Sequence, residues 1–290
     1  MDVKKFAVID IGSNSVRLMF VADGKILYKD LQITRLGEGL ATSGVLSKEA
    51  IERSATAVAD FYRRACAEGA QSVCAFATAA VRSASNGEEF VRCVNRLCGL
   101  SVEVISGEEE AEIGILGALG NADGGIIDIG GASTEIVVKK SGALVYKKSV
   151  DIGVVRLKDM CGRDKTALEK AANGASKQYG EIPLGDTIYA IGGTATTLAA
   201  QVLGLQQYSS EKVTGAVITA AAMQAMADKL LGMTVEEIAS LPCMPKGRAD
   251  VLTGGAVLFT VLMKNLGFKR LIVSDRDNLE GYAIKKGLME

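Results

Sequence analysis

Two aspartates occupy the same place in two similar segments, and both positions suit phosphate chemistry. Asp10 lies in the apolar strand pattern before Gly12-Ser13-Asn14-Ser15, and Asp128 lies in the one before Gly130-Gly131-Ala132-Ser133-Thr134. Turns of such small residues direct backbone N–H groups into one concavity, where a phosphate oxygen fits. An aspartate beside the turn can hold Mg²⁺, which prefers oxygen ligands. The alternative is that each aspartate only caps its own turn.

A third turn of this kind is Gly192-Gly193-Thr194, which follows an apolar strand and opens a helix. A helix that begins at a glycine turn adds the partial positive charge of its dipole to the backbone N–H groups. A single glycine turn usually only reverses the chain, so the prediction depends on the three turns together. The predicted phosphate-binding residues of the turns are Ser13, Asn14, Gly130, Gly131, Ala132, Ser133, Gly193 and Thr194.

Three consecutive glutamates, Glu108, Glu109 and Glu110, begin a predicted helix and are candidates for proton transfer. Successive helix residues point about 100° apart, so only one or two of them can face a shared cleft. The alternative is simple stabilisation of the helix N-terminus by negative charge. Farther along, Glu135 shares a strand face with Ser133, which places it near the second turn. The predicted metal ligands are Asp10, Asp128 and Glu135.

The chain contains no histidine, which excludes several classes of site. Histidine zinc sites, Ser-His-Asp triads, phosphohistidine chemistry and metal phosphohydrolases built on His-Asp pairs are all ruled out. The six cysteines are scattered without a CxxC pair, and we interpret them as reduced thiols. Proton transfer is therefore expected to depend mainly on carboxylates.

Length, charge and hydropathy indicate about two domains and no affinity for nucleic acid or membranes. The chain has 290 residues, with 33 Lys and Arg against 34 Asp and Glu, so its net charge favours neither partner. The N-terminus lacks the apolar core and cleavage site of a signal peptide. Apolar runs such as 254–263 fall short of the roughly 20 residues that span a bilayer. We expect a cytoplasmic protein.

The repetition of strand, small-residue turn and second strand predicts two related α/β lobes that share a cleft. Helical and strand patterns alternate in both halves, and the first half ends near Asn121. We therefore predict lobes at residues 1–121 and 122–290. The terminal helix, expected from about Asn278, is placed against the first lobe.

Six segments match, in order along nearly the whole chain, the motifs of a known family. They are 10–15 (DIGSNS), 77–82 (ATAAVR), 105–111 (ISGEEEA), 128–131 (DIGG), 192–194 (GGT) and 247–251 (GRADV). Together they resemble the exopolyphosphatase/guanosine-pentaphosphate phosphohydrolase family, in its short form with two lobes.

The resemblance implies a two-domain α/β fold of the actin-like ATPase (ribonuclease H-like) kind with the active site between the domains. It also implies Mg²⁺ dependence, with K⁺ as a candidate activator, and hydrolysis of terminal phosphoanhydrides. The family's catalytic carboxylate corresponds to Glu109, which would position the attacking water and accept its proton. Arg82 would clamp a phosphate oxygen, and the alternative for it is an ion pair with Glu88 or Glu89.

Three departures from the family pattern stand out. Glu112 occupies a position where several members carry arginine, so anion binding is expected to be weaker if that arginine contacts substrate. Ala132 replaces a glycine of the second turn and is expected to shift its geometry slightly, because alanine disfavours positive φ. The segment 274–281 resembles a family signature in which the glycine and arginine are changed here.

Substrate and partners stay open at this point. The expected substrate is inorganic polyphosphate or guanosine pentaphosphate, and a homodimer is the expected assembly from the resemblance. The Lys and Arg groups at 139–140, 147–148 and 156–158 are candidates for a polyphosphate track or for ordinary solvated surface. The rival functions are a sugar or acid kinase of the same fold and a sensor that binds polyphosphate or an alarmone without catalysis.

Overall fold

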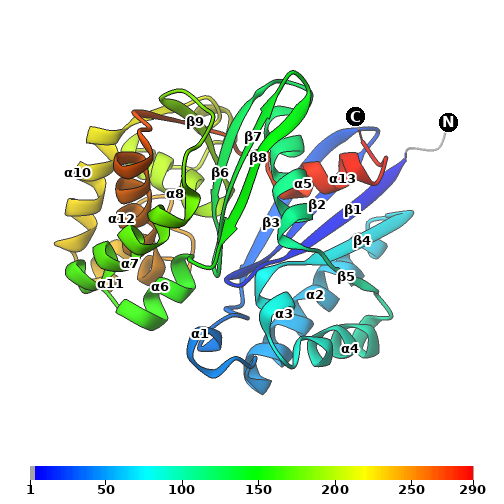
Figure 1. Ribbon diagram of the computed structural model, residues 1–290. Helices are drawn as coiled ribbons and strands as arrows, with labels where there is room; N and C mark the ends of the chain where they lie inside the picture. Colours follow the sequence, from blue (N-terminus) through cyan, green and yellow to red (C-terminus); the bar gives the residue numbers. More distant parts are fainter. Residues whose placement is uncertain (1–3, 290) are drawn as a thin grey trace.

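The computed structural model describes residues 4–289, whose strands form two mixed β-sheets (Figure 1). The first sheet has the order β3-β2-β1-β4-β5. Its strands are β1 (Lys5–Ile11), β2 (Ser15–Ala22), β3 (Lys25–Ile33), β4 (Ser72–Ala77) and β5 (Val102–Val104). The helices of this part are α1 (Leu40–Ser43), α2 (Lys48–Ala67), α3 (Ala79–Ser83), α4 (Gly87–Cys98) and α5 (Gly107–Leu119).

The second sheet has the order β10-β11-β9-β6-β7-β8. Its strands are β6 (Gly124–Ile129), β7 (Thr134–Lys140), β8 (Ala143–Val150), β9 (Thr187–Ile191), β10 (Val217–Thr219) and β11 (Arg270–Val273). The helices are α6 (Val154–Cys161), α7 (Lys165–Tyr179), α8 (Gly192–Val202), α9 (Ser210–Val213), α10 (Ala220–Leu231), α11 (Val235–Ala239), α12 (Ala249–Leu266) and α13 (Asn278–Lys285).

The two predicted hairpins are confirmed, and their turns are built alike. β1 pairs with β2 and β6 pairs with β7, both antiparallel. Gly12 N donates to Ser15 O at 3.0 Å, and Gly130 N donates to Ser133 O at the same distance. Both first strands are nearly continuous apolar runs, as expected for strands that are covered on both faces.

The terminal helix α13 packs on α5 and β1, so the chain returns from the second sheet to the first. In Figure 1 the two helices lie side by side between the sheets. Glycines make this close approach possible. A Cβ atom on Gly117 would lie 1.9 Å from the carbonyl oxygen of Asp277, and one on Gly281 would lie 1.7 Å from that of Ile113. The packing therefore holds the start of α13 in a fixed place beside α5.

Helix α12 is long and apolar enough to satisfy the length and hydropathy criteria for a membrane span. However, 72% of that window is buried inside the protein, where α12 packs against α7 and α10. Its side chains contribute to the largest apolar cluster of the molecule. We therefore interpret α12 as a core helix of the second lobe.

Candidate active site

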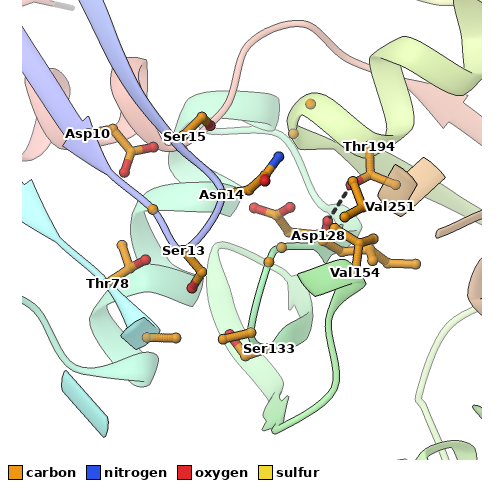
Figure 2. Close-up of a pocket in the computed structure, with 18 of the residues that line it drawn as sticks. Asp10, Ser13, Asn14, Ser15, Thr78, Asp128, Ser133, Val154, Thr194 and Val251 are labelled. Carbon is orange, nitrogen blue, oxygen red and sulfur yellow. Dashed lines mark hydrogen bonds between the residues drawn. The ribbon is translucent and has the colours of Figure 1, made fainter. Parts of the chain in front are cut away.

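A cavity of about 80 Å³ lies where the two hairpin turns meet the first turn of α8 (Figure 2). It opens between the two sheets, so each lobe supplies part of its wall. Most of the residues predicted from the sequence line it. They are Asp10, Ser13, Asn14, Asp128, Gly130, Gly131, Ala132, Ser133, Gly193 and Thr194. Three predicted residues, Arg82, Glu109 and Glu135, do not line it.

The two hairpin turns touch each other across the cavity. A Cβ atom on Gly131 would lie 2.7 Å from the Cβ atom of Ser13, so only glycine allows this approach. The first turn is also held by the segment that follows β3. The carbonyl oxygen of Asn14 accepts from the backbone N–H groups of Thr34 and Arg35 at 3.0 and 2.9 Å. The phosphate-binding shape is therefore formed before any ligand arrives, and preorganised donors bind anions more effectively.

The third turn places α8 against the second hairpin. Gly192 has φ +80°, and a Cβ atom there would lie 2.5 Å from Oδ1 of Asp128. Thr194 Oγ1 donates to the carbonyl oxygen of Ile129 at 2.8 Å, a contact drawn in Figure 2. These contacts fix the N-terminus of α8 at the cavity, where its dipole favours an anion. Ala132 is not among the residues with positive φ, so alanine fits the second turn without backbone strain.

The prediction that Glu109 faces the cleft is wrong. Its carboxylate points out of the cavity and pairs with Lys285 of α13 at 2.7 Å. Glu110, one residue later, lines the cavity and is only 8% exposed. The step of about 100° between helix residues explains the difference, because the cap at Ser106 fixes the rotation of α5. Glu108 is exposed and pairs with Lys147.

Arg82 lies beside Glu110 and does not pair with Glu88 or Glu89. Its guanidinium donates to Oε2 of Glu110 at 3.1 Å and to the carbonyl oxygen of Ile105 at 2.9 Å. The alternative of a surface pair is wrong, because Glu88 pairs with Arg92 instead. Arg82 is therefore placed to orient the cavity glutamate.

Burial dominates the electrostatics of Glu110. Burial and the nearby Glu135 raise the pKa of Glu110 to about 8, and Arg82 opposes this rise. A carboxyl group whose pKa lies near the working pH is suited to accept and return a proton. Glu110 thus has the environment that the sequence analysis assigned to Glu109.

Of the three predicted metal ligands, Asp128 and Glu135 face each other across the second hairpin, while Asp10 lies in the first. Asp10 is held by Arg17, and Glu135 accepts from the hydroxyl of Ser149 at 2.6 Å. Residues 4–289 contain no group of three or more Asp, Glu, Cys or His side chains arranged around one ion. The roles of Asp10, Asp128 and Glu135 as metal ligands therefore stay predictions, and Asp10 is the one whose carboxylate already has a cation, Arg17.

Asp128 and Glu110 nevertheless fit a magnesium ion. Both carboxylates line the cavity, and burial together with the neighbouring carboxylate of Asp277 raises the pKa of Asp128 well above its ordinary value. A divalent cation would offset this uncompensated negative charge. Mg²⁺ commonly takes only one or two protein carboxylates and completes its shell with water and substrate phosphate.

The structure brings three further residues to the cavity that the sequence analysis missed. Arg17 and Arg248 line it, and Asn278 donates to Oδ2 of Asp128 at 3.5 Å. The internal repeat could have indicated Arg17. It lies opposite Asp10 in the first hairpin, and Glu135 lies opposite Asp128 at the equivalent position of the second. No local pattern marks Asn278, whose place depends on the return of α13 to the first lobe.

A second cavity, of about 400 Å³, adjoins the first. Both are lined by Arg17, Gly192, Gly193 and Arg248, which form the wall between them. The remaining lining of the second cavity mixes apolar and aromatic groups with polar ones and includes Leu31, Tyr208, Met244 and Pro245. Glu112, by contrast, lies outside both cavities and pairs with Lys147 and Lys285.

The fold and the site define a two-lobed α/β protein whose glycine turns and buried carboxylates meet in a cavity between the lobes. Residues 18–288 match the Ppx/GppA phosphatase family, and the chain belongs to this family. It is 31% identical to exopolyphosphatase 2 of Mycobacterium tuberculosis, over 98% of this chain and 99% of that protein. A guanosine-5'-triphosphate,3'-diphosphate pyrophosphatase of Vibrio vulnificus is 30% identical, over 98% of this chain but only 58% of the relative.

Two solved structures agree with this assignment. The crystal structure of the Ppx/GppA family member of Aquifex aeolicus has a TM-score of 0.77 at 32% identity and covers 99% of this chain and 98% of its own. An exopolyphosphatase from Cytophaga hutchinsonii has a TM-score of 0.86 at 25% identity and covers 98% and 99%. The predicted actin-like α/β fold is confirmed.

Proposed function

We propose that this protein hydrolyses terminal phosphoanhydride bonds and releases orthophosphate. The observation that carries the proposal is the position of Glu110, a buried carboxyl group that faces two preformed glycine turns across one small cavity. The turns bind the phosphoryl oxygens through backbone N–H groups, and Glu110 supplies the proton acceptor that a water nucleophile needs. Full-length similarity to an exopolyphosphatase supports the same reaction.

In the proposed mechanism, water attacks the terminal phosphorus while the bridging oxygen leaves with the rest of the chain. Glu110 accepts the proton of that water, and Arg82 orients the glutamate. The turns at Ser13 and at Gly131 hold the non-bridging oxygens in place. Mg²⁺, held by Asp128 and Glu110, would offset the negative charge of the transferred group.

Inorganic polyphosphate is the proposed main substrate, because the exopolyphosphatase relative has the length of this chain. Guanosine pentaphosphate is a second candidate, and one observation favours it. The adjoining cavity is large enough for a nucleoside and has Tyr208 in its wall. Activation by K⁺, a cytoplasmic location and a homodimer also belong to this proposal.

The test is phosphate release by the purified protein with Mg²⁺ and K⁺ from long-chain polyphosphate, tripolyphosphate and guanosine pentaphosphate. Glu110→Gln is expected to lower turnover by at least about 100-fold, the cost of losing a general base. Glu109→Gln is the matched control, because it makes the same change one residue away and outside the cavity. It is expected to retain turnover within about threefold, since its exposed pair with Lys285 contributes little.

The outcomes separate the proposal from its rivals. Loss of turnover in the Glu109 variant with retention in the Glu110 variant would restore the original assignment of the base. Tight binding of a substrate without any release would identify a sensor. Phosphorylation of an added sugar or carboxylic acid at the expense of ATP would identify a kinase of this fold.

A further inference from the structure

Two arginines line the phosphate cavity, and their surroundings differ in charge. Arg248 donates to the carbonyl oxygen of Gly193 at 2.8 Å, and no carboxylate within residues 4–289 forms an ion pair with it. Arg17 pairs with two carboxylates, those of Asp10 and Asp277. One cation of the cavity is therefore available to a ligand, while the other is already neutralised.

The second partner of Arg17 comes from a different part of the fold. Asp10 faces Arg17 across the first hairpin and accepts from its Nε at 3.0 Å. Asp277 is the N-cap of α13 and reaches Nη1 of Arg17 from the segment that joins β11 to α13. It is 4% exposed, so water does little to screen its charge.

This network holds more carboxylates than cations. Lys29 is a second cation near Asp277, but its ammonium group pairs with Glu280 at 2.6 Å. Arg17 and Lys29 therefore face the three carboxylates of Asp10, Asp277 and Glu280. Although burial opposes it, Arg17 and Lys29 lower the pKa of Asp277, which keeps its carboxyl group ionised. The guanidinium of Arg17 thus carries one positive charge against two carboxylates beside the cavity.

We propose that Asp277 sets the affinity of the cavity for phosphate by competing, as a built-in anion, with the ligand for Arg17. A carboxylate and a phosphate oxygen use the same guanidinium donors, and a second buried anion repels an incoming one. This role rests on the proposed function and adds a specificity-determining residue to it. Asp277 keeps the released orthophosphate weakly bound, so that the product leaves and the next phosphate of the chain enters.

The variant Asp277→Asn tests this directly, because it removes the charge and keeps the cap. The side chain of Asp277 accepts from the backbone N–H of Leu279 at 3.1 Å, and asparagine caps a helix about as well as aspartate. Asp277→Gly is the second variant, since glycine costs a cap only a few tenths of a kcal/mol. The matched control is Asp275→Asn, which changes the same charge in the same segment, where Asp275 accepts from the hydroxyl of Tyr208.

The measurement is the dissociation constant of orthophosphate and of tripolyphosphate by titration calorimetry, without and with Mg²⁺. Both Asp277 variants are expected to bind orthophosphate at least about tenfold more tightly than the parent protein, because at an effective dielectric constant near 20 a charge of the same sign within roughly 12 Å accounts for that factor. The Asp275 variant is expected to change binding less than twofold. Binding requires no turnover, so this result stands apart from the test of hydrolysis.

A purely structural role for Asp277 predicts the opposite sign. If the carboxylate only held Arg17 in place, its loss would weaken phosphate binding or leave it unchanged, and either result overturns the proposal. Equal tightening of phosphate binding in the Asp275 variant would also overturn it. The effect would then come from the overall negative potential of the segment and not from competition for Arg17. In turnover assays, we expect a lower KM and stronger inhibition by orthophosphate in Asp277→Asn, without a gain in kcat.

Discussion

The two hairpins share a backbone but carry opposite electrostatics. In the first, Asp10 is opposite Arg17, and the two side chains form an ion pair. In the second, Asp128 is opposite Glu135, so the same register places two carboxylates together. The repeated strand and turn thus give one hairpin an internal counterion and leave the other with an excess of negative charge.

This difference in charge indicates different roles for the two hairpins in the cavity. The first hairpin supplies its own cation for Asp10, which is Arg17. The second has buried carboxylates whose pKa values are raised, which is the arrangement that a divalent cation would stabilise. Buried groups without a partner lower stability and are retained at functional sites. We therefore expect catalysis and pH dependence to follow the second hairpin.

The largest contrast is expected from equivalent substitutions in the two hairpins. Asp128→Asn should lower kcat by about 10² to 10³, the usual cost of losing an electrostatic group of the reaction centre. Asp10→Asn should lower kcat less than about tenfold, because the carboxylate that it removes is already paired with Arg17. Phosphate release measured across a series of Mg²⁺ concentrations checks this, and partial rescue by high Mg²⁺ is expected for Asp128→Asn alone. Equal losses in the two variants would contradict the division of work between the hairpins.

The next effect is on the pH profile. A general base must be ionised, and the pKa of Glu110 is raised to about 8 before any metal binds, so kcat/KM with Mg²⁺ should rise about tenfold per pH unit up to a midpoint below that value and level off above it. Arg82→Met should move the midpoint to higher pH, because Arg82 lowers the pKa of Glu110. The profile is recorded at fixed Mg²⁺, since a bound cation moves the midpoint down. An unchanged midpoint in Arg82→Met would show that another group titrates.

Stability should respond to the same charges in the opposite sense. Burial, followed by the charge of Asp128, raises the pKa of Glu135 to about 7 in the folded state, so the folded protein holds a proton that the unfolded chain releases at lower pH. Its contribution to stability is therefore present below about pH 4.5 and is lost as pH rises to about 7. Glu135→Gln should raise the unfolding free energy at pH 8 by about 1 to 3 kcal/mol and leave it nearly unchanged at pH 4. Glu108→Gln, an exposed control, should show no such dependence in thermal melts.

Much of the fold and the positions of the phosphate turns could be predicted from the sequence, because both depend on local patterns. Apolar runs and glycine turns mark β1 and β6 directly. The strand β3, however, was missed. It is an edge strand whose residues are half-buried or exposed, so it lacks a strong hydrophobic signal.

The site residues that were missed or misassigned depend on side-chain direction and on long-range packing. Three adjacent glutamates differ in sequence only by position, and the rotation of α5 that selects Glu110 is set by the cap at Ser106 and by packing against α13. Asp277 and Asn278 reach the cavity because α13 crosses back to the first lobe. No pattern within a single element carries this information.

The smallest effect is expected where the two turns differ in sequence but not in backbone. Ala132 holds the place in the second turn that Asn14 holds in the first, and neither residue is among those with positive φ. Ala132→Gly should therefore change kcat/KM by less than about twofold. It should lower the unfolding free energy by about 0.4 to 1 kcal/mol, because glycine makes the unfolded chain more flexible. A large gain in activity would mean that the second turn needs a backbone conformation that alanine restricts, and the equivalence of the two turns would then fail.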